Sequence, residues 1–131
     1  MMAGRSEQRP RPRDYGIEIG VLPTGPHNAI TDVSGLRVGH ATIAEHCTGV
    51  TAIVPDTLDS MFHRPMSAGT AVLNGAGELT GSLTIREWGT LETPVVLTAT
   101  MSVGMAYQGV VEATFGEVPD VADDVVIPVI G

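Results

Sequence analysis

Alternating apolar and polar residues predict short strands over much of the chain. Four runs are β-prone, at residues 35–43, 48–54, 68–73 and 95–100. In the first run Leu36, Val38 and His40 fall on one face, a two-residue period typical of a half-buried strand. The second run ends at Pro55, and the third leads into a glycine-rich stretch. We therefore expect a sheet built from short strands.

Two helices are predicted between and after these runs. Residues 102–115 place apolar side chains at helical spacing, and Ser102 precedes them as an N-cap candidate. The apolar set is Val103, Ala106, Tyr107, Val110, Val111 and Phe115. Residues 79–88 predict a shorter helix, which Gly81 weakens. The acidic stretch 117–124 is expected to be a loop.

The last apolar run, residues 125–130, is strongly β-prone but contains Pro128. An apolar strand left uncovered promotes aggregation. The run is therefore expected either to form a protected edge, which Pro128 suits, or to be followed by more chain.

Composition limits the classes of protein to which the chain can belong. Its 131 residues suit one domain, and 43% are apolar but only 4% aromatic, so aliphatic side chains must build the core. Four of the seven arginines lie in residues 1–13, which predict a disordered Arg/Pro-rich tail ahead of a single domain over residues 14–131. A net charge of −8 without a clustered basic face excludes nucleic-acid binding.

The remaining compositional signals concern location. No apolar run reaches the roughly 20 residues needed to cross a bilayer, and none follows the tail as in a signal peptide. Cys47 is the only cysteine, so a disulfide framework is impossible and no oxidising compartment is required. We expect a cytoplasmic protein that does not bind membranes.

The stretch between the third β-prone run and the shorter helix is the main candidate binding site. It reads Asn74-Gly75-Ala76-Gly77-Glu78, and its glycines permit positive φ and a close approach of backbone to a ligand. Glu78 is a partner for a substrate amine, and Asn74 offers both a donor and an acceptor. The alternative is an ordinary turn in which Glu78 favours the helix N-terminus. The two glycines do not match a dinucleotide-binding fingerprint.

Other candidate sites are less well supported. Ser102 lies where a strand leads into a helix, as in a nucleophile elbow, but the first glycine of that motif is missing and no base can be assigned. The N-cap interpretation is therefore favoured. His40 and His46 do not match zinc-ligand spacing, and no metal or cofactor is expected. Cys47 is interpreted as a small core residue, and Trp88 as a core or interface anchor.

Three segments together resemble a known family. They are Gly25–Ile43 (GPHNAITDVSGLRVGHATI), Cys47–Pro55 (CTGVTAIVP) and Val72–Gly81 (VLNGAGELTG), the last continuing to TATMSVGMAYQGVV at residues 98–111. In order and spacing they resemble the N-terminal portion of the DmpA-type aminopeptidases, the L-aminopeptidase D-amidase/D-esterase family that includes β-peptidyl aminopeptidases. The resemblance implies part of a four-layer α/β/β/α sandwich, similar to N-terminal-nucleophile hydrolases.

The resemblance also implies a mechanism and partners. Members cleave their own precursor before a serine or threonine, which becomes the nucleophile, and its α-amine, with a pKa near ~8, suits the role of general base. That nucleophile segment has no counterpart here, so the resemblance assigns no catalytic residue. It implies a homo-oligomer that hydrolyses N-terminal residues from small peptides, amides or esters once the missing C-terminal half completes it. The alternatives are a non-catalytic truncated paralogue acting as a binding or regulatory module, and a small serine hydrolase using Ser102.

Overall fold

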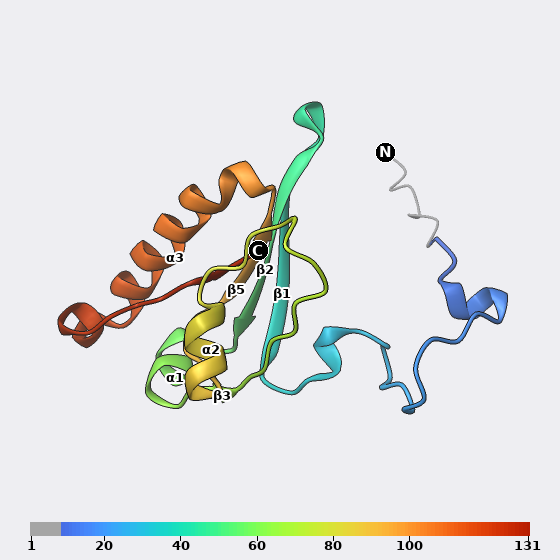
Figure 1. The fold of residues 1–131 in the computed structure, drawn as a ribbon, viewed down its shortest axis with the longest axis horizontal. Helices are drawn as coiled ribbons and strands as arrows, with labels where there is room; N and C mark the ends of the chain where they lie inside the picture. Colours follow the sequence, from blue (N-terminus) through green and yellow to red (C-terminus); the bar gives the residue numbers. More distant parts are fainter. Residues whose placement is uncertain (1–8) are drawn as a thin grey trace, which may run out of the picture.

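A four-stranded mixed sheet organises the molecule. The structure, a computed structural model, describes residues 9–131, except for the side chains of residues 58–60, 122 and 123. The strand order is β1-β2-β5-β6, with bounds Leu36–Ile43, Thr48–Pro55, Val95–Thr98 and Val129–Ile130. The first three strands pair antiparallel, and β6 adds parallel to β5 (Figure 1).

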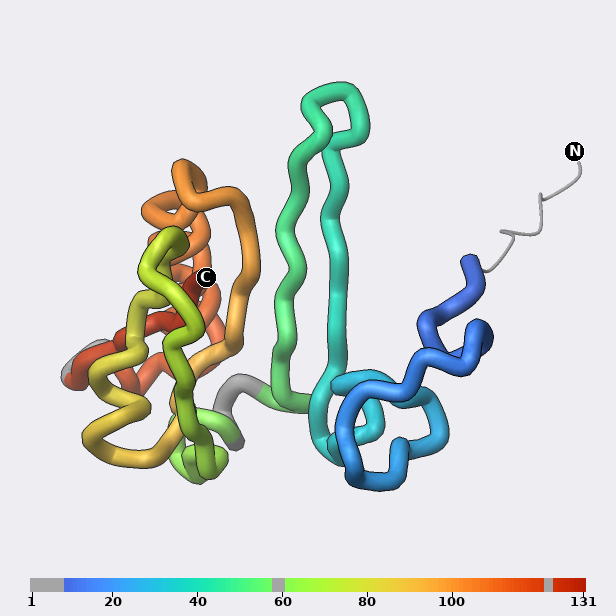
Figure 2. Tube along the Cα trace, turned by 45° about the vertical axis from the view of Figure 1, so that its right-hand side comes forward, coloured from blue at the N-terminus to red at the C-terminus, as the bar shows by residue number. Residues whose placement is uncertain are grey.

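Strands β1 and β2 form a long hairpin that projects beyond the other strands (Figures 1 and 2). Its turn is a short 3₁₀ helix, Ala44–His46, closed by Cys47 in the left-handed region at φ 50°. Cys47 is therefore exposed at the tip, and the prediction that it is a core residue is wrong. At the tip of a projecting hairpin no other described element packs over the turn, so the thiol stays exposed to solvent.

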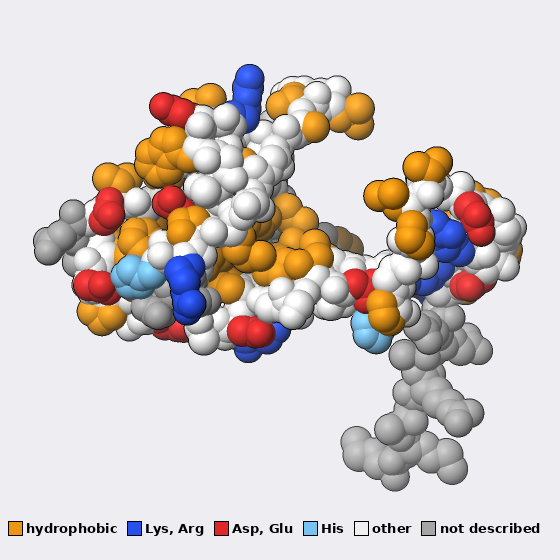
Figure 3. Space-filling model, turned by 90° about the horizontal axis from the view of Figure 1, so that it is seen from below, with side chains coloured by type: hydrophobic (Ala, Val, Ile, Leu, Met, Phe, Trp, Pro, Cys, Tyr) orange, Lys and Arg blue, Asp and Glu red, His pale blue; other side chains and the backbone are white. Residues whose placement is uncertain are grey.

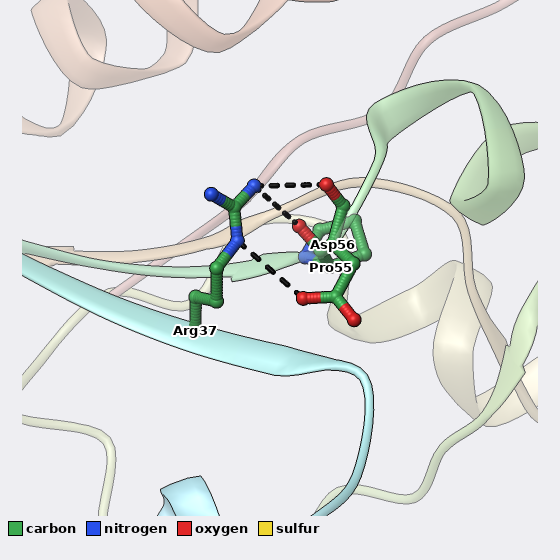
Figure 4. A network of polar contacts seen from close by, with 3 residues as sticks. All are labelled: Arg37, Pro55 and Asp56. Atoms are coloured by element: carbon green, nitrogen blue, oxygen red, sulfur yellow. Dashed lines mark hydrogen bonds and ion pairs between the residues drawn. The ribbon is translucent and has the colours of Figure 1, made fainter.

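At the other end of the hairpin, Arg37 of β1 binds the end of β2. Its Nη2 donates to the carbonyl oxygens of Pro55 at 3.3 Å and Asp56 at 2.9 Å, and its Nε lies 3.5 Å from the Asp56 carboxylate (Figure 4). The planar guanidinium donates in several directions at once, which suits it to a strand end. Both side chains are largely exposed, so the ion pair itself adds little stability.

Helix α3, Val103–Glu117, covers one face of the sheet. The core between them consists of Val96, Val110 and Ile130, with half-buried apolar side chains around them. Those neighbours are Val50, Ala52, Val103, Ala106 and Tyr107. The predicted helix and most of its apolar face are thus confirmed, but Phe115, in the last turn of the helix, is 42% exposed.

Shorter elements complete the body. Helix α1 (Leu58–His63) and helix α2 (Ser82–Trp88) flank a two-stranded sheet of β3 (Met66–Ser67) and β4 (Thr90–Leu91). A second core cluster, Val118, Val121 and Val126, packs against Phe62 and Val111. The acidic stretch after α3 contains a 3₁₀ helix, Pro119–Asp123, and His63 Nε2 lies 3.1 Å from the Asp120 carboxylate.

Three predicted strands and helices differ from the structure, and the stretch 117–124, predicted to be a loop, contains the 3₁₀ helix Pro119–Asp123. Residues 68–73 form no strand, because only Ala68 bonds across to Gly89 and the rest lacks a partner. The shorter helix begins at Ser82 instead of residue 79, because Gly81 takes a left-handed conformation at φ 68° that starts it. In the run 125–130 only Val129 and Ile130 pair, since Pro128 has no N–H to donate.

An N-terminal arm, residues 9–32, extends away from the body (Figures 1 to 3). It contains a 3₁₀ helix, Pro12–Tyr15, whose first two residues belong to the predicted Arg/Pro-rich tail. Proline fits the first helical position, and Asp14 accepts a hydrogen bond from Arg11 N at 2.7 Å. The Arg11 guanidinium also donates to the carbonyl oxygens of His27 and Asn28. Residues 1–8 lie outside the described residues.

Acid should loosen the turn at the base of this arm. The Asp32 carboxylate accepts from His27 N at 2.9 Å and Ala29 N at 3.2 Å, and the His27 bond is the main reason that its pKa lies below the usual 3.8. A lowered pKa stabilises the turn above pH 3.8, and this contribution is lost as the pH falls through the folded-state pKa. The protection of the His27 and Ala29 amides against exchange, measured by NMR relative to the intrinsic rate at each pH, should fall below that point. Asp32→Asn should remove the pH dependence; its persistence would assign it to another group.

Candidate functional site

The candidate loop Asn74–Glu78 is tied to strand β6 through Thr80. The Thr80 hydroxyl donates to Pro128 O at 2.7 Å and accepts from Ile130 N at 2.9 Å, while Thr80 N donates to Ile130 O at 2.9 Å. These three bonds join residues about fifty positions apart in the chain. The end of the loop is therefore held beside the C-terminal strand, close to the core.

Gly81 allows the segment to approach β6 this closely. A Cβ at Gly81 would lie 2.9 Å from Val129 Cγ2 and 3.1 Å from Pro128 O. Just before Gly81, Glu78 O and the Leu79 side chain lie near Gly131. The side chain of Leu97 in β5 lies near Gly131 as well. The loop thus emerges over the carboxyl ends of the parallel pair β5 and β6.

The polar side chains of the loop are held locally and face solvent. Asn74 Oδ1 accepts from Ala76 N at 3.0 Å, and Glu78 Oε1 accepts from Leu79 N at 3.2 Å. Gly75 and Gly77 lie in open space and neither has a positive φ, so no backbone packs against them in the described residues. The four predicted residues are therefore together in one exposed loop, with the Glu78 carboxylate unpaired by any described cation.

Ser102 occupies the N-cap position of α3 but does not cap it through its side chain. A 3₁₀ turn, Thr100–Ser102, leads into the helix, and the Ser102 hydroxyl makes no capping hydrogen bond. Its backbone N–H instead bonds to Ala99 O at 2.7 Å. The predicted position is confirmed, but the side-chain capping role is not observed.

The remaining candidates do not assemble into a site. His40 Nδ1 lies 2.8 Å from Thr51 Oγ1 across the hairpin, whereas His46 and Cys47 lie at the hairpin tip. Within residues 9–131 as described, no group of three or more His, Cys, Asp or Glu side chains could hold a metal ion. No helix among the described residues has both the length and the apolar character needed to cross a membrane.

Replacing Thr80 should release the loop from β6. Thr80→Val keeps the shape but removes both hydroxyl bonds and leaves Ile130 N without its acceptor. Because these groups are partly buried, we expect a loss of about 1–3 kcal/mol in the free energy of unfolding. Urea denaturation checks this, with the exposed Thr42→Val as the matched control. Equal stabilities for the two variants would contradict a structural role for Thr80.

A family model matches most of the chain. The model of Peptidase family S58 matches residues 28–131. Curated relatives include a beta-peptidyl aminopeptidase, BapA, of Sphingosinicella xenopeptidilytica, 39% identical over 124 residues. Its counterpart from Sphingosinicella microcystinivorans is 37% identical over 123 residues. The matches cover 86% and 85% of this chain but 30% of each relative.

Solved structures match the fold over most of the chain. The PH0078 protein of Pyrococcus horikoshii superposes with a TM-score of 0.79 at 34% identity, over 91% of this chain and 37% of its own. A Burkholderia sp. beta-aminopeptidase gives 0.73 at 42% identity, over 92% and 35%. The L-aminopeptidase D-Ala-esterase/amidase of Ochrobactrum anthropi, described as a variant of the Ntn hydrolase fold, gives 0.74 at 36%, over 93% and 37%. The predicted fold, part of a DmpA-type α/β/β/α sandwich, is confirmed.

Proposed function

Because the chain belongs to Peptidase family S58 and spans about 30% of its curated relatives, we propose that it forms the N-terminal portion of an aminopeptidase. The whole enzyme would hydrolyse N-terminal residues from small peptides, amides or esters. Within it, this chain provides the scaffold and one wall of the substrate pocket. The nucleophile is contributed by the part of the enzyme that the chain does not span.

The observation that carries this proposal is the placement of Glu78. Its carboxylate is exposed in a loop that Thr80 and Gly81 fix against β6, so its position is defined although the side chain is accessible. An aminopeptidase must bind the charged α-amine of its substrate. A carboxylate is the natural partner, because charge-assisted hydrogen bonds are about twice as strong as neutral ones. Asn74 can supply a further donor and acceptor.

The proposal includes how the enzyme is made and where it acts. A precursor cleaves itself before a serine or threonine, whose freed α-amine then accepts the hydroxyl proton. Preorganised donors stabilise the oxyanion of the tetrahedral intermediate. The processed protomers assemble into a homo-oligomer in the cytoplasm. Support for these steps is the family membership alone.

Complementation tests the proposed function. The chain is co-expressed with the part of the Burkholderia sp. beta-aminopeptidase that it does not match, a relative with which it shares 42% identity. We expect the purified complex to release the chromophore from an aminoacyl anilide, whereas neither part does so alone. A folded, correctly associated complex that stays inactive would contradict the proposal.

A further inference from the structure

A pocket lies where α1, α2 and the segment before β6 meet, apart from the Asn74–Glu78 loop. Its volume is about 370 Å³. The lining residues are Phe62, Trp88, Glu92, Asp124, Val125 and Ile127. Among the described side chains that line it, two are aromatic, two are aliphatic and two are carboxylates, and none is basic. None of these residues belongs to the candidate loop.

The aromatic walls come from separate elements. Phe62 lies in α1, where one side of it packs against the second core cluster, so its position is fixed. Trp88 is the last residue of α2 and keeps 59% of its surface exposed. Of the two roles predicted for Trp88, the core role is therefore wrong, and the role of an interface anchor stays a prediction. An indole face held open to solvent is a favourable surface for a cation.

The carboxylates give the pocket negative charge that the described residues do not neutralise. Glu92 is half-buried, and neither it nor Asp124 forms an ion pair within the described part of the chain. Asp124 Oδ1 accepts a hydrogen bond from Val125 N at 2.7 Å, which orients the Asp124 carboxylate. Viewed from the end that carries α1 and α2, apolar side chains gather on the body, with acidic side chains and a smaller number of basic and His side chains around them (Figure 3).

We propose that this pocket binds an organic ammonium group. Such a cation is attracted to the face of an aromatic ring, more strongly as it loses its water, and Trp attracts it best. Its methyl or methylene groups contact Val125 and Ile127, while Glu92 and Asp124 supply the opposite charge. The volume suits a small ligand or the end of a side chain. A metal ion would not use the aromatic walls.

Trp88 provides a direct readout because it is the only tryptophan in the chain. The 131-residue protein is titrated with choline at constant ionic strength while the fluorescence is followed. The control is 3,3-dimethyl-1-butanol, which has the same shape but carries no charge. We expect a saturable change with choline and none with the alcohol over the same concentrations. Identical responses to the two compounds, or a choline response that does not saturate, would overturn the proposal.

A pair of double variants separates the pocket from the general negative charge of the protein. Glu92→Gln with Asp124→Asn should weaken choline binding about tenfold, because both opposite charges are removed. Glu45→Gln with Glu112→Gln removes the same charge from the hairpin tip and the exposed side of α3, and should leave the affinity unchanged. Equal affinities for both double variants would show that the pocket does not bind the cation. Since no activity is measured, failure here is independent of the proposed function.

Discussion

Ile130→Ala should destabilise the protein more than any other single truncation that we consider. Ile130 is completely buried where β6, β5 and α3 meet, and it shares its core cluster with Val96 and Val110. The substitution removes the side-chain carbons beyond Cβ and leaves a cavity. Because β6 is held by its pairing with β5, the strand cannot move to fill that cavity. We expect a loss of about 2–5 kcal/mol in the free energy of unfolding. A domain of this size has about 5–15 kcal/mol in total, so the transition in urea should shift strongly.

Ile19→Ala is the matched control for that experiment. Ile19 is the same residue type but lies in the N-terminal arm and is 80% exposed. Its truncation should change stability by no more than about 0.5 kcal/mol. If both variants unfolded at the same urea concentration, the core between α3 and the sheet would not hold the fold together.

Gly81→Ala should weaken the contact between the candidate loop and β6. Gly81 has φ 68°, and an added Cβ would meet Val129 Cγ2 at 2.9 Å and Pro128 O at 3.1 Å. The left-handed conformation costs about 1–2 kcal/mol for a residue with a Cβ. Overpacking against β6 adds about 1–3 kcal/mol. Urea denaturation should therefore show a loss clearly larger than the conformational part.

Gly89→Ala measures the conformational contribution alone, so its difference from Gly81→Ala gives the contribution of overpacking against β6. Gly89 has a similar φ of 71°, but a Cβ there would meet nothing within 4 Å. It should lose only the conformational part. A Gly89→Ala variant as unstable as Gly81→Ala would mean that the close approach to β6 contributes nothing.

The elements that could be predicted from sequence are those whose signal is local. The alternating run ending at Ile43 forms β1, and the helical spacing after Ser102 forms α3, because each pattern directly specifies which face is buried. Residues 68–73 have the same β-prone composition but no neighbouring strand to pair with. Strand formation depends on that partner, which a single-sequence pattern does not reveal.

In the candidate site too, the sequence motif predicts some residues, whereas others are found only from the fold. The motif identifies Asn74 and Glu78, but the residues that position them, Thr80 and Gly81, act through contacts with Pro128 and Val129. Those contacts span almost fifty residues and leave no periodic signal. The pocket at Trp88 was also missed, because its walls come from three segments that only the fold brings together.

The role of Glu78 is tested most directly by the kinetics of the complemented enzyme. Glu78→Gln should lower kcat/KM about 10- to 100-fold for an anilide with a free α-amine, since charged hydrogen bonds contribute about 1.5–3 kcal/mol. The same change should leave unaltered the turnover of an analogue with hydroxyl in place of the amine. Glu87→Gln, an exposed carboxylate of α2, is the control. If Glu78→Gln lowered kcat/KM equally for both substrates, or for neither, the Asn74–Glu78 loop would not be the amine-binding wall of the pocket.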